Sequence, residues 1–220
     1  MPTSERAVHI PTVSDPLEGN LAIPEGAEGI VVFAHGSGGS RHSPRNRSLA
    51  NELQNGGIAT LLMDLLTEEE EAQDKRKGQF RFNIDLLAQR VIEAVDWLWD
   101  QEDTHSLNIG AFGSSTGAAA ALIAAANRPN EIRAVVSRGG RPDLARGALS
   151  MITSPTLMIV GEKDESVLQV NQKAAARMTA KVAVEIIPGA TYRFQEPGAM
   201  EKTARLAYQW FRRFLFEKAS

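Results

Sequence analysis

Residues 107–121, LNIGAFGSSTGAAAA, decide how the rest of this chain is interpreted. An apolar run typical of a buried strand stops at Gly113, and a block of alanines typical of a helix follows Gly117. Between them lies Gly-x-Ser-x-Gly, in which Ser115 occupies a sharp strand-to-helix turn that has room only for small neighbours. We therefore predict that Ser115 is an exposed nucleophile. The N–H of Thr116, which opens the helix, then faces a developing oxyanion.

The composition is that of an ordinary globular protein. The chain has 220 residues, 43% hydrophobic and 23% charged, which suffices for one sizeable core and is short for two domains. A net charge of −3 gives no reason to expect nucleic acid as a partner. The absence of cysteine excludes disulfides, thiolate metal sites and a cysteine nucleophile. We expect a single domain over residues 1–220.

Strands and helices alternate along the chain. Continuous apolar runs predict buried strands at 29–34, 58–66, 107–112, 132–137, 156–160 and 182–187. Helical spacing of apolar residues predicts helices at 46–55, 83–99, 167–178 and 199–216. A hairpin at one sheet edge is predicted from 6–13 and 17–23, and the charge run 67–78 is interpreted as a solvated loop or the exposed start of a helix. The alternation predicts an α/β fold with a mostly parallel sheet, helices on both faces and no large cap domain.

The loops that follow these strands carry the polar residues of interest. In an open parallel sheet, functional groups collect beyond the carboxyl ends of the strands. The loop after strand 29–34 begins His35-Gly36-Ser37-Gly38, and we predict that the Ser37 N–H is a second oxyanion donor beside Thr116. The strand at 156–160 is followed by Gly161-Glu162-Lys163-Asp164, and the last strand by the long loop 188–198.

This set of motifs, in this order, resembles the α/β-hydrolases, and specifically the small dienelactone-hydrolase-like esterases. The resemblance covers nearly the whole chain. The order of the catalytic groups in that fold is nucleophile, acid, histidine. The resemblance implies that Ser115 is the nucleophile, where dienelactone hydrolase itself carries a cysteine, and that Asp164 is the acid. Glu162 and Glu165 are close competitors for the acid.

The third position departs from the family pattern, which looks like Pro-Gly-Ala-Thr-His. Here the loop reads Pro188-Gly189-Ala190-Thr191-Tyr192, so Tyr192 stands at the place of the histidine. None of the four histidines, His9, His35, His42 and His105, follows Ser115. Neutral imidazole accepts and returns a proton near neutral pH, whereas a phenol, with a pKa of about 10, remains protonated there. Loss of one triad member typically leaves only about 10³–10⁴-fold acceleration, so we expect hydrolysis to be impaired.

Three explanations for Tyr192 stay open. It is a His→Tyr substitution in an otherwise active esterase, a natural divergence that turned the protein into a binder, or a sign that His35 or His42 replaces the base. We favour the substitution because the surrounding loop otherwise follows the family pattern. His35 is interpreted as a residue that orients its loop through backbone hydrogen bonds, and His42 as an exposed residue near the substrate entrance.

The sequence as a whole predicts a serine hydrolase that acts on small esters or lactones through an acyl-Ser115 intermediate. The alternative is a non-catalytic ligand-binding protein on the same scaffold. His35, Gly36 and Arg41 are predicted to bind substrate. Arg45, Arg138 and Arg141 join Arg41 at this edge of the sheet, where arginine pairs well with carboxylate or phosphate. We nevertheless prefer the interpretation that these arginines anchor loops to acidic neighbours.

No cofactor or metal is expected. The glycine-rich loop at 36–40 lacks the Gly-Lys-Ser/Thr ending of a P-loop and the spacing of a dinucleotide fingerprint, and no His, Asp or Glu cluster has metal spacing. The N-terminal residues lack a signal-peptide pattern and no apolar run approaches the length of a membrane span, so we expect a cytoplasmic protein without a membrane partner. The oligomeric state, monomer or homodimer, is left open.

Overall fold

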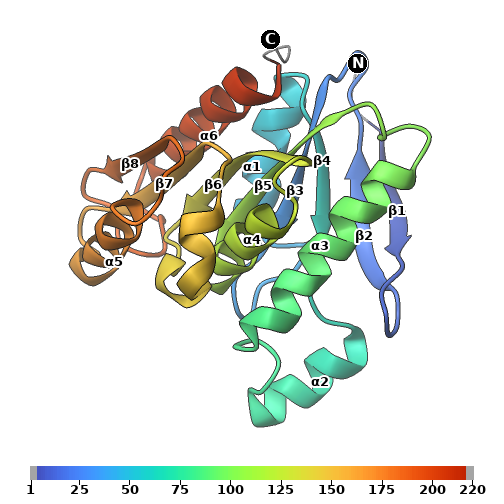
Figure 1. Ribbon diagram of the computed structural model, residues 1–220, viewed down its shortest axis with the longest axis horizontal. Helices are drawn as coiled ribbons and strands as arrows, with labels where there is room; N and C mark the ends of the chain where they lie inside the picture. The colour runs from blue at the N-terminus through green and yellow to red at the C-terminus, as the bar shows by residue number, and fades with distance from the viewer. Residues whose placement is uncertain (1–3, 217–220) are drawn as a thin grey trace.

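The computed structural model describes residues 4–216 of the chain, so residues 1–3 and 217–220 of the predicted domain lie outside the described residues. Eight strands form one sheet in the order β1-β2-β4-β3-β5-β6-β7-β8 (Figure 1). The strands are β1 (Glu5–Ile10), β2 (Leu17–Ala22), β3 (Gly29–Ala34), β4 (Ala59–Met63), β5 (Asn108–Ser114), β6 (Ile132–Arg138), β7 (Thr156–Gly161) and β8 (Val182–Ile187).

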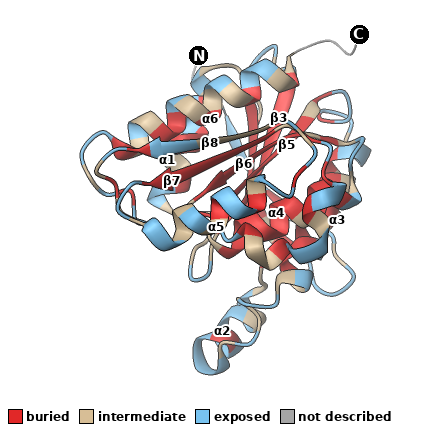
Figure 2. Cartoon of the chain, turned by 60° about the vertical axis from the view of Figure 1, so that its left-hand side comes forward, coloured by how far each residue is buried: buried red, intermediate tan, exposed pale blue. Residues whose placement is uncertain are grey.

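The sheet is mostly parallel. Only the β1–β2 and β2–β4 pairs are antiparallel, and the pairs from β4 through β8 are parallel. The predicted edge hairpin and the predicted α/β class are therefore confirmed. All six residues of β3 are buried, as its continuous apolar sequence GIVVFA indicates, because helices cover both faces of the central strands (Figure 2).

Helices form a layer on each face of the sheet (Figures 1 and 2). One face is covered by α1 (Pro44–Asn55) and α6 (Ala199–Leu215). The other face is covered by α3 (Ile84–Asp100), α4 (Thr116–Asn127), the 3₁₀ segment η1 (Pro142–Met151) and α5 (Glu165–Ala175). Between β6 and β7 the chain forms only η1, which agrees with the predicted absence of a large cap.

Aromatic side chains dominate the core under α1 and α6. Phe33 of β3 and Phe112 of β5 pack with ring centroids 5.0 Å apart, and Phe211 of α6 is fully buried against the same face. Burial of one such side chain contributes about 1.5–3 kcal/mol to stability. Gly110 of β5 makes the packing possible, since a Cβ there would lie 2.7 Å from the Phe211 ring. This core holds the carboxyl ends of β3 and β5 side by side.

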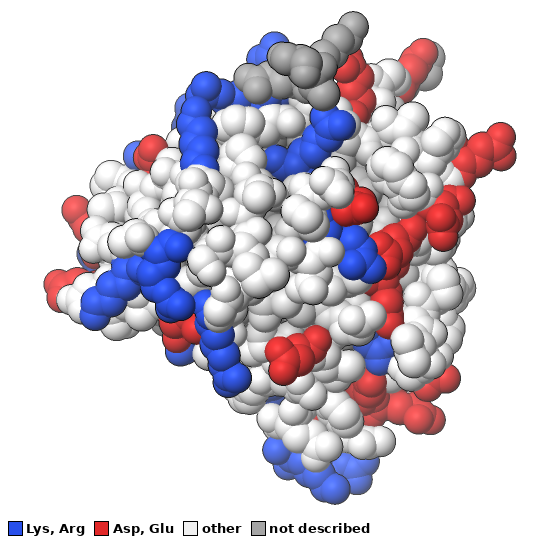
Figure 3. Space-filling view, in the orientation of Figure 1, with Lys and Arg blue, Asp and Glu red and all other residues white. Residues whose placement is uncertain are grey.

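The charge run after β4 folds into a complete helix, α2 (Glu68–Lys77). Thr67 accepts a hydrogen bond from the Glu70 N–H, and the Glu70 side chain accepts one from the Thr67 N–H, which is a capping box. The first turn is acidic and the last turn is basic, an order that favours the helix dipole. Figure 3 shows the resulting group of basic side chains at the lowest point of the molecule in that view.

A single buried carboxylate attaches α2 to the segment before α3. Asp74 accepts hydrogen bonds from the backbone N–H groups of Phe80, at 2.6 Å, and Arg81, at 3.1 Å, and pairs with the Arg81 guanidinium. Burial alone would raise the pKa of Asp74, but these hydrogen bonds and the charge of Arg81 hold it below its ordinary value. Because Asp74 is the buried residue of α2, this carboxylate fixes the helix on the protein.

No helix within residues 4–216 combines the length and the apolar character that crossing a membrane requires.

Replacement of Asp74 by alanine should loosen α2 without unfolding the sheet. The backbone N–H groups of Phe80 and Arg81 lose their acceptor, so we expect amide hydrogens of residues 68–77 to exchange about tenfold faster or more, while those of β3 and β5 keep their protection. Hydrogen exchange read by mass spectrometry checks this. Asp85→Ala, at an exposed carboxylate on α3, is the control, and equal effects of the two variants would contradict the assignment.

Candidate active site

Ser115 lies in a strained turn between β5 and α4. Its φ of 51° and ψ of −122° are unusual for a residue with a side chain. A Cβ at Gly113 would lie 2.4 Å from the Ala118 Cα, and one at Gly117 would lie 2.3 Å from the Ala34 carbonyl oxygen. Both positions therefore require glycine, which is the physical reason for the Gly-x-Ser-x-Gly pattern.

The loop after β3 packs directly against this turn. The Gly36 N–H donates to the Ser114 hydroxyl and the Ser37 N–H donates to the Thr116 hydroxyl, each at 3.1 Å. The two predicted oxyanion donors, on Ser37 and Thr116, are thus brought together beside Ser115. As the first residue of α4, Thr116 has an N–H without a partner one turn back in its helix. An oxyanion at this place would compete with the Thr116 hydroxyl for the Ser37 N–H.

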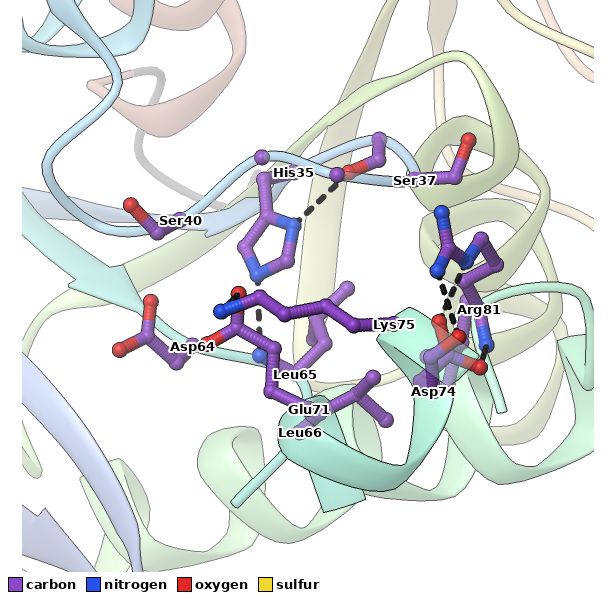
Figure 4. Close-up of a pocket in the computed structure, with 14 residues that line it drawn as sticks. His35, Ser37, Ser40, Asp64, Leu65, Leu66, Glu71, Asp74, Lys75 and Arg81 are labelled. Carbon is purple, nitrogen blue, oxygen red and sulfur yellow. Dashed lines mark hydrogen bonds and ion pairs between the residues drawn. The ribbon is translucent and has the colours of Figure 1, made fainter. Parts of the chain in front are cut away.

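His35 orients this loop and uses both ring nitrogens to do so. Its Nε2 accepts a hydrogen bond from the Leu65 N–H at 3.1 Å, which leaves Nδ1 to donate to the Gly36 carbonyl at 2.9 Å (Figure 4). Burial lowers the pKa of His35, since a charged imidazole would lose its hydration there. The imidazole is therefore neutral and structural, which agrees with its interpretation as a loop-orienting residue and leaves no free nitrogen for a base.

A small pocket of about 140 Å³ lies on the α2 side of the same loop, between residues 35–40, the end of β4 and α2 (Figure 4). Asp64 lines it, and the backbone N–H of Arg41 donates to the Asp64 carboxylate at 2.6 Å while the Arg41 guanidinium pairs with the same group. Arg41 also lies 3.8 Å from Glu18 and does not line the cleft at Ser115. The charge of Arg41 is thus compensated by carboxylates outside that cleft, and these contacts give no support to the prediction that it binds substrate.

A cleft of about 840 Å³ opens above Ser115. The predicted residues Ser37, Ser115, Asp164 and Tyr192 line it, and so do His35 and Gly36. Thr116 lies behind Ser115 at the amino end of α4. The structure thus brings the predicted site residues into one region, apart from Arg41.

Asp164 is the carboxylate in this cleft after β7. It begins α5, where its side chain accepts from the Val167 N–H at 3.4 Å and from the Ser166 hydroxyl at 3.3 Å. Its competitor Glu162 instead accepts from the Gly189 N–H at 2.7 Å and so holds the loop after β8. Glu162 and Glu165 do not line the cleft. These contacts favour Asp164 as the acid facing Ser115.

Tyr192 lines the cleft but turns outward. Its side chain is 62% exposed, its hydroxyl accepts from Arg193 Nε at 2.7 Å, and the Arg193 guanidinium lies 5.4 Å from its ring centroid. Phe194, two residues further along, is buried at a φ of 53° and anchors the loop. Among the described residues, no hydrogen bond joins Tyr192 to Ser115 or Asp164. The phenol therefore does not reproduce the contacts that a base needs.

The cleft also contains Arg138, one of the four arginines expected at this edge of the sheet, and Asn46, which the sequence patterns did not single out. Arg138 is the last residue of β6 and is buried, with Nη2 3.2 Å from the Asn46 Oδ1 of α1. Asn46 was recognised only as the start of a helix. The available signal was the charged residue at the end of IRAVVSR, a strand whose centre is apolar.

Comparison with known proteins supports the fold and identifies the family. A family model described as an alpha/beta hydrolase domain matches residues 27–213. The crystal structure of dienelactone hydrolase from Anabaena variabilis is 52% identical with a TM-score of 0.97, covering 98% of this chain and all of that one. Est1E from Butyrivibrio proteoclasticus, 16% identical with a TM-score of 0.80 and coverage of 96% and 99%, shows the fold alone.

Two curated relatives are not named as hydrolases. They come from two strains of Mycobacterium tuberculosis, and their names assign them provisionally to the phosphoribosyl transferases. Each is 51% identical to this chain over 210 residues, which is 96% of this chain and 46% of the relative. The chain thus spans about half the length of the curated relatives it matches.

The buried neutral imidazole of His35 should make stability depend on pH. Because the pKa of His35 is lower in the folded protein than in the unfolded chain, the unfolded chain binds more protons below about pH 6.5. The contribution of His35 is complete above that pH and is lost as the pH falls toward its folded pKa. Urea unfolding at pH 7.5 and 5.5 should therefore show a larger loss for the parent chain than for His35→Gln.

The exposed histidine variant His105→Gln serves as the control for this measurement and should retain the pH dependence of the parent chain. An unchanged pH dependence in His35→Gln would show that the imidazole is not held neutral.

Proposed function

Because the chain belongs to the α/β-hydrolase family, we propose that it is a serine hydrolase that acts on small esters or lactones through an acyl intermediate on Ser115. The family and its structural neighbours support a hydrolase. The observation that carries the finer proposal is the backbone of Ser115, whose φ of 51° presents the side chain at the floor of the cleft.

For the first half of the reaction we propose a nucleophile and two oxyanion donors, whereas the base that must take the Ser115 proton is the missing group. Ser115 attacks the ester carbonyl, and the N–H groups of Ser37 and Thr116 receive the negative charge that develops on the carbonyl oxygen. Such donors typically contribute about 10²–10³-fold to the rate each. Their approach depends on the hydrogen bond from Ser37 N–H to the Thr116 hydroxyl, which fixes the loop against α4.

Within the part of the chain that the structure describes, the cleft lacks a residue suited to transfer the proton of Ser115. Tyr192 stands where the family has its histidine, faces solvent and contacts Arg193. His35 uses both nitrogens for the loop, so His42, which is exposed and lines the cleft, is the remaining histidine within reach of this region among residues 4–216. We propose that Ser115 is acylated slowly and that release of the acyl group is slower still, since no imidazole activates the water.

The shape of the cleft supports a small substrate. Only η1 lies between β6 and β7, so the cleft has no helical cap to enclose a long acyl chain. The phosphoribosyl transferase assignment belongs to relatives that are about twice as long as this chain, and we do not extend it to the cleft. Fold alone does not select a substrate.

A second candidate is a binding protein that uses the same cleft without turnover. The outward position of Tyr192 favours it, because a side chain pointing to solvent leaves the cleft open for a ligand and supplies no base. The two proposals differ in what a restored histidine would do.

Tyr192→His should raise the hydrolysis of p-nitrophenyl acetate by about 10³-fold or more, because an imidazole turned into the cleft from this position would supply the missing base. Initial rates of the parent chain, Tyr192→His and Tyr192→His/Ser115→Ala check this, and the double variant should return to the parent rate. A folded Tyr192→His protein without any gain would favour the binding protein.

A further inference from the structure

We propose that the α1 side of this cleft is a phosphate-binding subsite, in which Arg138, Arg45 and the amino end of α1 hold a dianionic group of the substrate. This subsite rests on the proposed function in one respect only: the substrate binds in this cleft. The substrate is then a small molecule that carries a phosphate monoester in addition to the group that reacts with Ser115.

Arg138 is a buried cation without a carboxylate. Its side chain is 7% exposed, and its contacts are Asn46 Oδ1 at 3.2 Å, the Met200 sulfur at 3.8 Å and the Phe112 ring, whose centroid lies 5.5 Å away. Each of these partners is neutral. Burial of a guanidinium is unfavourable unless an opposite charge compensates it, so a buried arginine facing a cleft indicates a missing anion.

A second arginine increases the imbalance. Burial and then the charge of Arg45 lower the pKa of Arg138 to about 10, so the two guanidinium groups are close enough to repel one another. Arg45 donates to the Arg193 carbonyl at 2.8 Å, and among the described residues neither Arg45 nor Arg138 has an ion-pair partner. By contrast, Arg141 in the same cleft pairs with Asp143 at 2.7 Å. The uncompensated charges of Arg45 and Arg138 therefore both lie on the α1 side of the cleft.

The amino end of α1 adds a positive potential at the same place. Ser43, Pro44, Arg45 and Asn46 line the cleft, so the first turn of this 12-residue helix opens into it. Ser43 makes no side-chain cap, and no acidic residue occurs in the first turn. A helix amino end carries about half a positive charge and offers unpaired N–H groups, which suits an anion.

The amount of charge favours a dianion. Two guanidinium groups and a helix amino end together exceed the charge of one carboxylate, whereas a phosphate monoester has about two negative charges and oxygen atoms for two arginine forks. Asp164, Ser115 and Ser37 line the same cleft. A substrate bound here would have its phosphate at α1 and its reacting group at Ser115.

Inorganic phosphate is the probe, and isothermal titration calorimetry at constant ionic strength and pH 7.5 is the measurement. We expect saturable binding to the parent chain and about tenfold or greater weakening in Arg45→Gln and in Arg138→Gln. Arg47→Gln is the matched control, because Arg47 lies on the same helix, pairs with Glu5 and does not line the cleft. It should bind phosphate as the parent chain does.

Three results would overturn the proposal: no saturable binding, acetate binding as tightly as phosphate, or equal weakening by Arg47→Gln and Arg45→Gln. Arg45 is exposed, so its variant keeps the test valid even if Arg138→Gln fails to fold. Ser115→Ala should retain phosphate binding. If the chain binds phosphate but Tyr192→His gains no esterase activity, the subsite is supported and the proposed reaction is disproved. If Tyr192→His gains esterase activity but the chain does not bind phosphate, the reaction is supported and the subsite is disproved.

Discussion

The close backbone approach between the turn at Ser115 and the chain that leaves β3 is the constraint on which the site depends. At Gly117, even one added carbon would lie 2.3 Å from the Ala34 carbonyl oxygen and 2.4 Å from that of His35. Two neighbouring parallel strands can end this close together only because the residues at the crossing lack side chains. The strained backbone of Ser115 costs about 1–3 kcal/mol, which the surrounding core offsets.

The same approach explains why the histidine nearest to Ser115 serves structure. The loop at 35–40 must stay flat against α4, and it has few side chains with which to hold itself. The His35 imidazole supplies two of the necessary contacts, to Leu65 and to Gly36, and must remain neutral to do so. A ring fixed in this way is unavailable for proton transfer. The proposed site therefore combines a firmly held Ser115 and two backbone N–H groups with a Tyr192 side chain that makes no hydrogen bond to Ser115 or Asp164 among the described residues.

The cleft is electrostatically divided. Asp164 lies on the side of β7 and α5, whereas Arg45 and Arg138 lie on the side of α1. In a medium less polar than water such a division orients a charged ligand strongly. The open rim, without a cap between β6 and β7, exposes the ligand to solvent but leaves the floor shielded by the loop and by α4. Charged side chains can orient a ligand even in an open cleft that encloses little of it.

Local steric rules were sufficient to predict the parallel sheet, the edge hairpin and the turn at Ser115, because β3 and the Gly-x-Ser-x-Gly stretch carry their constraints in adjacent residues. The sequence also contained a local signal for α2, the capping box at Thr67 and Glu70. The high charge of the run favoured its interpretation as a solvated loop or the exposed start of a helix. The outward turn of Tyr192 and the uncompensated charge of Arg138 were decided only by the tertiary structure. Both depend on which distant segments of the chain fold against a side chain. The contacts between α1, β6 and the loop after β8 join residues far apart in the sequence, so the local pattern of residues does not reveal them.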